Sequence, residues 1–310
     1  MKLVTFEYEG SHRLGCVSGE HIVDLNYAAE SWLNSLGKYR SRQIAEAYVP
    51  ADMVGFLEGG EDSMEMAANA LAFALSHSEG ASGRKMRHLL SDVKLAAPVR
   101  QPRKIICVGH NYREHILEMG REIPKYPVLF AKFANTIIGP QDDIPYPAMT
   151  NQLDYEAEFA FVIGKRAQRV REENALDYVA GYTIVNDVTS RDLQRRTVQW
   201  LQGKSVDGSA PMGPWLVTKD EIPDPHNLNI ELRVNGEIRQ RSNTSNLVFN
   251  VHHLVSFLSG IMTLEPGDVV CTGTPGGVGA AMDPPVFLGE GDVVNIQIDG
   301  IGTLENKVRK

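Results

Sequence analysis

The sequence predicts an α+β protein that is mainly β, in which a β-rich roll or barrel follows a smaller N-terminal α/β module. The chain has 310 residues, enough for one large domain and one small one. After Pro98 and Pro102 it changes to short apolar runs separated by tight turns. Before that point, short alternating segments lead into helical patterns. We therefore expect an N-terminal module over residues 1–95 and a main domain over 100–310.

The N-terminal module combines two kinds of periodicity. Alternating apolar residues predict strands at 3–8, 12–17 and 20–24, and apolar residues at helical spacing predict helices at 26–36 and 61–77. A polar, glycine-containing stretch at 76–83 is typical of a loop.

The main domain carries strong local signals. Asn235-Gly236 separates two alternating segments, 229–234 and 237–240, which indicates a β-hairpin with a two-residue turn. Two stretches, 265–270 and 289–294, share a turn followed by a strand. An apolar stripe over 247–258 predicts a helix closed by Gly260, with His252 and His253 as ordinary helix residues. A weaker stripe predicts a helix from Thr189 to Gln202.

Composition excludes several classes of partner. The net charge is −8 and no basic run is present, which argues against nucleic acid or an acidic membrane surface as a partner. No run of about 18 apolar residues predicts a membrane span, and the N-terminus lacks the apolar core of a signal peptide. Three widely spaced cysteines, Cys16, Cys107 and Cys271, are typical of reduced core residues. We expect a soluble, cytoplasmic protein with a small-molecule substrate.

Three carboxylates are candidates for a metal site. Glu156 and Glu158 precede the apolar run 159–163, and Asp187 ends a second apolar run. Side chains two apart on a strand point to one face, so the glutamates and Asp187 would repel one another unless a cation lies between them. Oxygen ligands of this kind suit Mg²⁺ or Mn²⁺. A solvated strand face is the commoner fate of an isolated Glu-x-Glu pair.

The glycine loop, residues 273–279, contains several glycines but does not suit a dinucleotide. No helix is predicted after it and Pro284-Pro285 follows, so the required βαβ unit is missing. Its backbone N–H groups can still point at a carboxylate.

A set of motifs in order resembles the fumarylacetoacetate hydrolase family over roughly residues 100–305. The motifs are Ile106 to His115, the Glu156-x-Glu158 strand, Asn186 to Gln194, Lys204, Gly213-Pro214-Trp215 and Gly273-Thr274-Pro275. The branch it resembles contains acylpyruvate hydrolases, oxaloacetate decarboxylases, and isomerases and hydratases of aromatic degradation. The resemblance implies a mixed β-roll, a divalent metal and a homodimer.

The resemblance also assigns residue roles. It implies metal ligands at Glu156, Glu158 and Asp187, a catalytic His115–Glu118 pair on a mobile helix, Lys204 facing the substrate, and substrate contacts from Gln194 and Thr274. A spacing of three places His115 and Glu118 on one helix face, where the carboxylate can orient a general base. Gly120 and Pro124 frame this segment as a lid. The alternatives are a surface pair for His115 and Glu118, a solvated lysine, a surface amide for Gln194 and a turn residue for Thr274.

One departure from the family pattern narrows the substrate. The stretch 107–111 contains no carboxylate, where the founding hydrolase has an aspartate, which argues against fumarylacetoacetate as substrate. Arg113, Lys132 and Arg191 are candidates to meet a second substrate carboxylate, although a surface or structural charge is their commoner role.

The implied chemistry is shared among several reactions. We expect a divalent-metal-dependent enzyme that cleaves a C–C bond of a 2-oxo acid through a metal-bound enolate, as an acylpyruvate hydrolase or oxaloacetate decarboxylase does. The first alternative is an isomerase or hydratase of a 2-hydroxy-dienedioate. The second, from another class, is a non-catalytic, metal-binding scaffold dimer.

Overall fold

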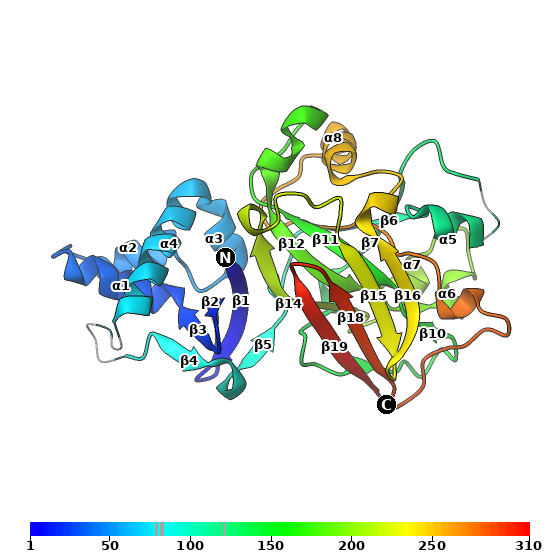
Figure 1. The fold of residues 1–310 in the computed structure, drawn as a ribbon, viewed down its shortest axis with the longest axis horizontal. Helices are drawn as coiled ribbons and strands as arrows, with labels where there is room; N and C mark the ends of the chain where they lie inside the picture. Colours follow the sequence, from blue (N-terminus) through cyan, green and yellow to red (C-terminus); the bar gives the residue numbers. More distant parts are fainter. Residues whose placement is uncertain (78–79, 81–83, 119, 121) are drawn as a thin grey trace.

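A mixed β-sheet runs through the molecule and joins its N-terminal part to the rest (Figure 1). The computed structural model describes residues 1–77, 80, 84–118, 120 and 122–310. Most neighbouring strands are antiparallel, but β17 and β6 run parallel. The strand order is β4 (Arg87–Leu89), β3 (His21–Asp24), β2 (Ser11–Ser18), β1 (Lys2–Tyr8), β14 (Ala210–Thr218), β12 (Val179–Asn186), β11 (Ala157–Ile163), β17 (Val269–Cys271), β6 (Ile105–Gly109) and β7 (Val128–Lys132), with β5 (Lys94–Ala96) beside β1 and β8 (Ile137–Ile138) beside β14.

A second sheet completes the β-roll. Its order is β16 (Glu237–Asn243), β15 (Asn229–Val234), β18 (Val293–Ile298), β19 (Gly302–Arg309) and β9 (Ile144–Pro145). The predicted hairpin is confirmed: Asn235 and Gly236 both have positive φ, 52° and 83°, as a tight turn between β15 and β16 requires. The two similar turn-and-strand stretches are also alike in structure. Asp268 and Asp292 each accept a backbone N–H three residues back, at 2.7 Å.

Helices cover the N-terminal strands and flank the β-roll. The N-terminal helices are α1 (Leu25–Ser35), α2 (Ser41–Tyr48), α3 (Met53–Glu58) and α4 (Gly60–Ser76), and the others are α5 (Arg113–Glu118), α6 (Arg191–Gln194), α7 (Leu201–Lys204) and α8 (Val251–Ile261). The predicted helices at 26–36 and 61–77 correspond to α1 and α4, whereas α2 and α3 were not predicted. Part of the predicted loop at 76–83 (78, 79 and 81–83) lies outside the described residues.

The central strands are buried on both faces by two different cores. Along β11, Phe159 and Phe161 enter a core that also contains α8, whereas Ala160 and Val162 enter a core shared with the N-terminal helices. This alternation is the two-residue period of a strand. It fixes β11, and with it the acidic end of the strand, between two packed layers. The α+β, mainly β prediction with a mixed β-roll is therefore confirmed.

Three predicted elements have different bounds. The helix expected from Thr189 to Gln202 was wrong: β13 (Thr189–Ser190) comes first, and α6 and α7 are separate short helices. The strand predicted to contain both Glu156 and Glu158 is shorter, because β11 begins only at Ala157, and the preceding β10 (Leu153–Asp154) pairs with β13. Gly260 lies inside α8 instead of closing it.

The surface and the cysteines carry further information. The three cysteines are free and buried, as predicted.

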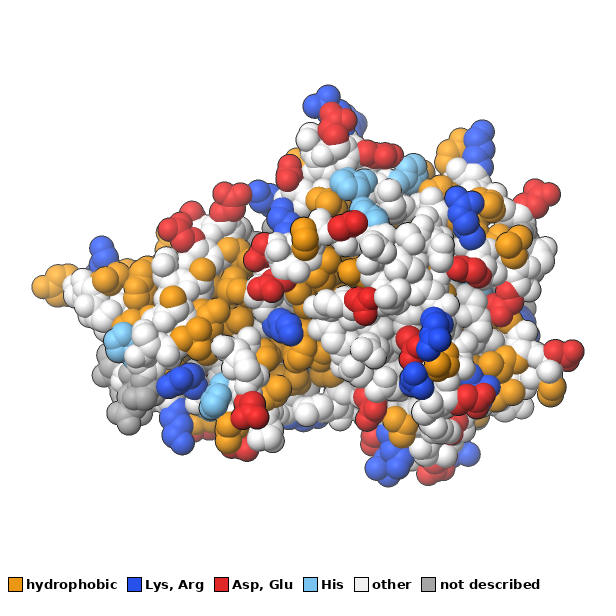
Figure 2. Space-filling model, viewed as in Figure 1, with side chains coloured by type: hydrophobic (Ala, Val, Ile, Leu, Met, Phe, Trp, Pro, Cys, Tyr) orange, Lys and Arg blue, Asp and Glu red, His pale blue; other side chains and the backbone are white. Residues whose placement is uncertain are grey.

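On the face seen in Figure 2, apolar side chains gather over the N-terminal helices and their junction with the β-rich part, whereas charged side chains are spread over the rest. Within the described residues, no helix has the length and apolar character needed to cross a membrane.

Candidate metal centre and active site

The acidic triad, Glu156, Glu158 and Asp187, lies where β11 and β12 meet. Glu156 directly precedes β11, and Asp187 directly follows β12. The two strands are antiparallel, and the backbone N–H of Asp187 donates to the carbonyl of Glu156 at 2.9 Å. One carboxylate oxygen from each residue lies within 4.8 Å of the others, and all three side chains are buried. The structure therefore brings together the three residues that the sequence proposed as ligands.

Buried cations surround two members of the acidic triad. The Lys204 ammonium donates to Glu156 at 2.7 Å and to Asp187 at 2.6 Å. Lys132 donates to Asp187 at 2.8 Å, and Arg191 contacts Glu156 at 2.7 Å. Burial raises the pKa of Glu156, but the charges of Lys204 and Arg191 outweigh burial and lower it to about 2. The interpretation of Lys204 as a solvated surface lysine is therefore wrong.

Glu158 differs from its two neighbours. Its carboxylate accepts the backbone N–H of Gly273 at 2.6 Å, and no lysine or arginine among the described residues forms an ion pair with it. Burial, followed by the charges of Asp187 and Glu156, raises the pKa of Glu158 well above its usual range. A divalent ion bound beside Glu158 would supply the positive charge that keeps this buried carboxylate ionised. The donor set, carboxylate oxygens from three converging residues, fits Mg²⁺ or Mn²⁺.

The His115–Glu118 pair lies on α5, and its geometry is fixed from outside the helix. Nδ1 of His115 lies 3.3 Å from Oε2 of Glu118. Both Glu118 oxygens accept the backbone N–H of Gly277, at 3.0 and 3.2 Å. The ring of His115 stacks with that of His110, whose backbone has a positive φ of 53°. The lid prediction framed by Gly120 and Pro124 involves residues 119 and 121, which lie outside the described residues.

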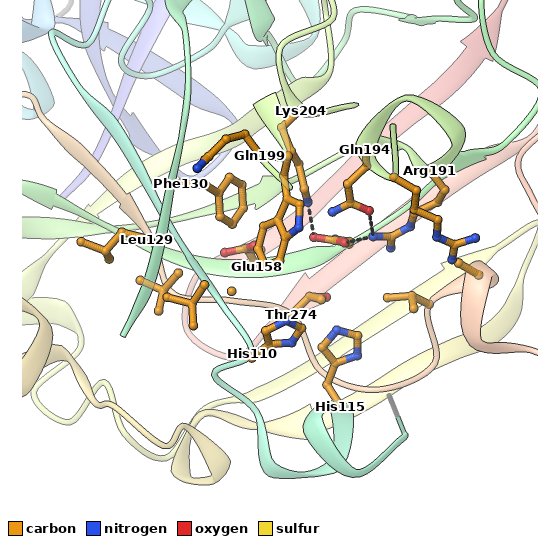
Figure 3. A pocket seen from close by; sticks show the side chains of 18 of the residues that line it. His110, His115, Leu129, Phe130, Glu158, Arg191, Gln194, Gln199, Lys204 and Thr274 are labelled. Atoms are coloured by element: carbon orange, nitrogen blue, oxygen red, sulfur yellow. Dashed lines mark hydrogen bonds and ion pairs between the residues drawn. The ribbon is translucent and has the colours of Figure 1, made fainter. Parts of the chain in front are cut away.

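Glu156 and Glu158 of the acidic triad and His115 of the histidine pair line one cavity of about 620 Å³ (Figure 3). Figure 3 shows His110 and His115 on one side of it and Lys204, Gln194 and Arg191 on the other. Gln194 accepts from Arg191 at 3.2 Å, and the Thr274 hydroxyl accepts from Gln240 at 2.8 Å. The lining residues are Val108, Gly109, His110, His115, Val128, Leu129, Phe130, Glu156, Glu158, Arg191, Gln194, Arg195, Thr197, Val198, Gln199, Trp200, Lys204, Thr274, Val278 and Ala280.

The glycine loop points its N–H groups at carboxylates, and these belong to the protein itself. Gly273 donates to Glu158, Gly277 to Glu118, and Gly279 and the adjacent Ala280 to Asp154 at 2.8 and 3.0 Å. A short 3₁₀ turn over Gly279–Ala281, not an α-helix, ends the loop, so the rejection of a dinucleotide motif stands. The loop therefore ties an acidic-triad residue, the histidine pair and Asp154 to one segment of backbone.

The sequence did not predict the buried charged side chains that hold the site residues in place. Asp154 is fully buried and accepts from Arg191 at 2.8 Å, so Arg191 bridges Asp154 and Glu156. Lys132 and Arg191 are structural charges, the role that the sequence analysis gave as commoner than a contact to a substrate carboxylate. The signal for Lys132 was present, because it closes an apolar strand where an unpaired ammonium would be costly. His252 and His253 contact Glu172 and, among the described residues, belong to no metal-binding group.

Comparison with known proteins identifies close relatives. A model of the fumarylacetoacetate (FAA) hydrolase C-terminal family matches residues 104–309. A Xenopus laevis protein named "Oxaloacetate tautomerase fahd2, mitochondrial" is 43% identical over 316 residues, covering 99% of this chain and 90% of that protein. "Oxaloacetate tautomerase YisK" of Bacillus subtilis (strain 168) is 51% identical over 223 residues, covering 71% of this chain and 74% of that protein.

Solved structures agree over the whole chain. Fumarylacetoacetate hydrolase from psychrophilic Exiguobacterium antarcticum has a TM-score of 0.80 at 39% identity, covering 100% of this chain and 99% of that one. Maleylpyruvate hydrolase from Sphingobium sp. SYK-6, in complex with manganese(II) and pyruvate, has a TM-score of 0.74 at 30% identity, covering 100% of this chain and 99% of that one. 2-Hydroxyhepta-2,4-diene-1,7-dioate isomerase from Mycobacterium marinum has a TM-score of 0.72 at 30% identity, covering 100% of this chain and 98% of that one. The chain is an enzyme that belongs to the fumarylacetoacetate hydrolase family.

Proposed function

We propose that this enzyme interconverts the keto and enol forms of a short 2-oxo dicarboxylic acid of the oxaloacetate type. The observation that carries the proposal is that His115, which is paired with Glu118, lines the same cavity as Glu156 and Glu158 of the buried acidic triad. The relatives at 43% and 51% identity, both named oxaloacetate tautomerases, favour this substrate class. Tautomerisation moves one proton between C3 and the C2 oxygen, so it needs a positioned acid–base group and no attacking water.

The acidic triad would hold Mg²⁺ or Mn²⁺. A divalent ion bound there supplies Lewis acidity, which makes the proton at C3 of a 2-oxo acid more acidic. Support comes from the donor set, from Glu158, which forms no ion pair with a lysine or arginine in the described ranges, and from a related structure that contains manganese(II).

The protein's own groups would move and orient the proton. His115 removes a proton from C3, and a proton returns to the C2 oxygen, so no atom is gained or lost. Glu118, held by the Gly277 N–H, keeps Nδ1 of His115 in one tautomer and leaves Nε2 for the substrate. Lys204 contributes positive charge where negative charge develops, and Gln194 and Thr274 bind polar atoms of the substrate.

C–C cleavage remains the second candidate. The related maleylpyruvate hydrolase was solved with pyruvate, and cleavage of an acylpyruvate or decarboxylation of oxaloacetate would release the same product. Isomerisation of a dienedioate is a proton transfer like the proposed one, and the Mycobacterium marinum neighbour favours it. A non-catalytic scaffold is set aside, because the chain is an enzyme of this family.

The test uses protein stripped with EDTA and then reloaded with Mg²⁺ or Mn²⁺. Decay of the ultraviolet absorbance of enol-oxaloacetate should require the metal, and His115→Ala should slow it by about 10²–10⁴-fold while metal binding is retained. Nuclear magnetic resonance on the same samples would detect pyruvate. Release of pyruvate faster than tautomerisation would favour the cleavage candidate, and metal-independent decay would contradict the proposal.

Homodimerisation and a cytoplasmic location stay predictions. The dimer follows from the family resemblance, and light scattering of the purified protein would test it. The printed name of the Xenopus laevis relative includes the word mitochondrial, so microscopy of the tagged protein in its own cell is the direct test of compartment.

A further inference from the structure

A dicarboxylate substrate raises the question of which cation binds its second carboxylate. The sequence offered Arg113, Lys132 and Arg191. Lys132 is committed to Asp187, and Arg191 to Asp154 and Glu156. Arg113 is exposed and does not line the cavity. Arg191 lines the cavity and its Nη2 has no hydrogen-bond partner, but its other guanidinium nitrogens pair with carboxylates. None of the three is therefore a cavity cation that is free of a carboxylate partner.

Arg195 is a lining cation of a different kind. It follows α6 directly, and its backbone is fixed because its N–H donates to the Arg191 carbonyl at 3.1 Å. Its side chain is exposed and lines the same cavity as Glu156 and Glu158. In the part of the chain that the structure describes, no carboxylate lies within 4.0 Å of its guanidinium and no acceptor is hydrogen-bonded to it. The other lining arginine and the lining lysine are both paired with carboxylates.

Charge balance points to the same residue. The floor of the site contains four buried carboxyl groups and three buried cations: Asp154, Glu156, Glu158 and Asp187 beside Lys132, Arg191 and Lys204. A divalent ion and the first carboxylate of a 2-oxo acid would together bring this group close to neutrality. A second carboxylate then needs a cation outside the floor, and Arg195 supplies a planar, always charged one that pairs with carboxylates through two hydrogen bonds.

We infer that Arg195 binds the far carboxylate of the substrate and sets the preference for a 2-oxo dicarboxylate over a 2-oxo monocarboxylate. The inference rests on the proposed function, because it takes the near end of the same substrate to lie over the acidic triad. It also gives a role to the break between α6 and α7. The 189–202 segment does not continue as one helix, and the residues between α6 and α7, including Arg195, form one wall of the cavity.

The kinetic test compares oxaloacetate with 2-oxobutanoate, which has a methyl group in place of the second carboxylate. Oxaloacetate is followed by enol absorbance, and 2-oxobutanoate by exchange of its C3 protons in D₂O. Arg195→Gln should lower the ratio of the two kcat/KM values by at least about tenfold, the loss expected for one charged hydrogen bond, mainly through the KM of oxaloacetate. Arg195→Lys should retain part of the ratio. Arg196→Gln is the matched control, because Arg196 is exposed and does not line the cavity.

Binding separates this inference from the proposed function. Trp200 lines the cavity, whereas Trp32 and Trp215 do not, so tryptophan fluorescence reports occupancy without turnover. With Mg²⁺ present, the wild-type protein should bind oxaloacetate more tightly than 2-oxobutanoate, and Arg195→Gln should abolish the difference. A wild-type protein that binds but turns over neither acid would refute the proposed function alone. Equal affinities in the wild-type protein, or an unchanged difference in Arg195→Gln, would overturn the role of Arg195.

Discussion

Glu158 is the acidic-triad residue that has no ion-pair partner in the part of the chain that the structure describes. Burial and two neighbouring carboxylates raise its pKa, while a backbone N–H from Gly273 holds its side chain in place. Glu158→Gln keeps an oxygen for that N–H and removes the repulsion. We therefore expect the metal-free variant to be at least as stable as the wild type, with Mn²⁺ affinity lower by at least about tenfold, roughly 1.4 kcal/mol.

Calorimetric titration with Mn²⁺ would measure the affinity, and thermal unfolding in EDTA the stability. The wild type should also gain about 2.7 kcal/mol of stability when Mn²⁺ is present at about 100 times its Kd, and this gain should fall to about 1.4 kcal/mol or less in the variant at the same concentration. An unfolded variant, or one with unchanged Mn²⁺ affinity, would mean that Glu158 is a structural residue and not a ligand.

Lys204 is expected to contribute most to the stability of the fold when no metal is bound. Its ammonium is buried between Glu156 and Asp187, and these two charges outweigh burial and raise its pKa. Lys204→Met leaves two buried carboxylates without that partner, so the free energy of unfolding in EDTA should fall by about 3 kcal/mol. A divalent ion at the acidic triad would neutralise the same carboxylates, so the deficit should be smaller in Mn²⁺.

Urea denaturation with and without Mn²⁺ would measure both deficits. The control is Lys165→Met, because Lys165 pairs with Glu61 at the surface and such pairs contribute about 0–1 kcal/mol. Equal deficits in EDTA and Mn²⁺ would indicate that the lysine and the metal do not act on the same carboxylates.

The sequence could predict the acidic triad but not its surroundings. The strand period and the two apolar runs made Glu156, Glu158 and Asp187 candidates, and the family resemblance assigned them as metal ligands. The partners of these carboxylates are not local. Lys132 lies 55 residues from Asp187, and Arg191 lies 37 residues from Asp154. Only the folded chain decides that such groups meet, so the sequence could not name the carboxylates that pair with Lys132 and Arg191.

At the scale of elements, local chemistry decided which predictions held. The hairpin at Asn235-Gly236 and helix α1, capped by Asp24, carry their signals within a few residues. The predicted helix over 189–202 failed in its middle. Thr197 and Val198 are β-branched, and the Thr197 hydroxyl donates to the Gln199 carbonyl at 2.8 Å, a bond that competes with helical hydrogen bonding.

The glycine loop links the metal centre to the histidine pair, and Gly277 is the position where this link can be broken. Its φ is +97°, and an added Cβ would lie 1.9 Å from the Arg239 carbonyl oxygen. Gly277→Ala must therefore shift the loop and remove the N–H that holds Glu118. We expect kcat to fall by at least about tenfold because the general base is no longer oriented. Mn²⁺ affinity should be retained, because Glu158 is held by Gly273 at the other end of the loop.

Steady-state kinetics and Mn²⁺ titration would measure both quantities. Gly291→Ala is the control, since Gly291 has a similar φ of +91° but open space around its Cβ. It should lose about 1 kcal/mol of stability and leave kcat as in the wild type. A parallel loss of Mn²⁺ affinity and kcat in Gly277→Ala would mean that the loop collapses as a whole.

At the scale of the molecule, the division at residues 95–100 separates two segments of the sequence, but these segments share one sheet and one hydrophobic core. The family model begins at residue 104, close to the predicted start of the main domain. Yet β1 pairs with β14, with Leu3 opposite Leu216, and one core contains Leu3 and Phe56 together with Cys107 and Met212. Pairing between residues more than 200 positions apart leaves no local trace, so the sequence could not predict that the sheet is continuous.

This continuity predicts that residues 100–310 do not fold alone. Removing 1–95 would expose the edge of β14 and the apolar face that β1 and the N-terminal helices cover, and a long exposed edge favours aggregation. We expect the fragment to be insoluble or to elute as aggregates from size-exclusion chromatography with light scattering. Co-expression of 1–95 as a separate chain should restore soluble protein that binds Mn²⁺, because the lost contacts are non-covalent. A monodisperse fragment with full-length Mn²⁺ affinity would instead establish two independent domains, since the acidic triad would then persist without the N-terminal layer behind β11.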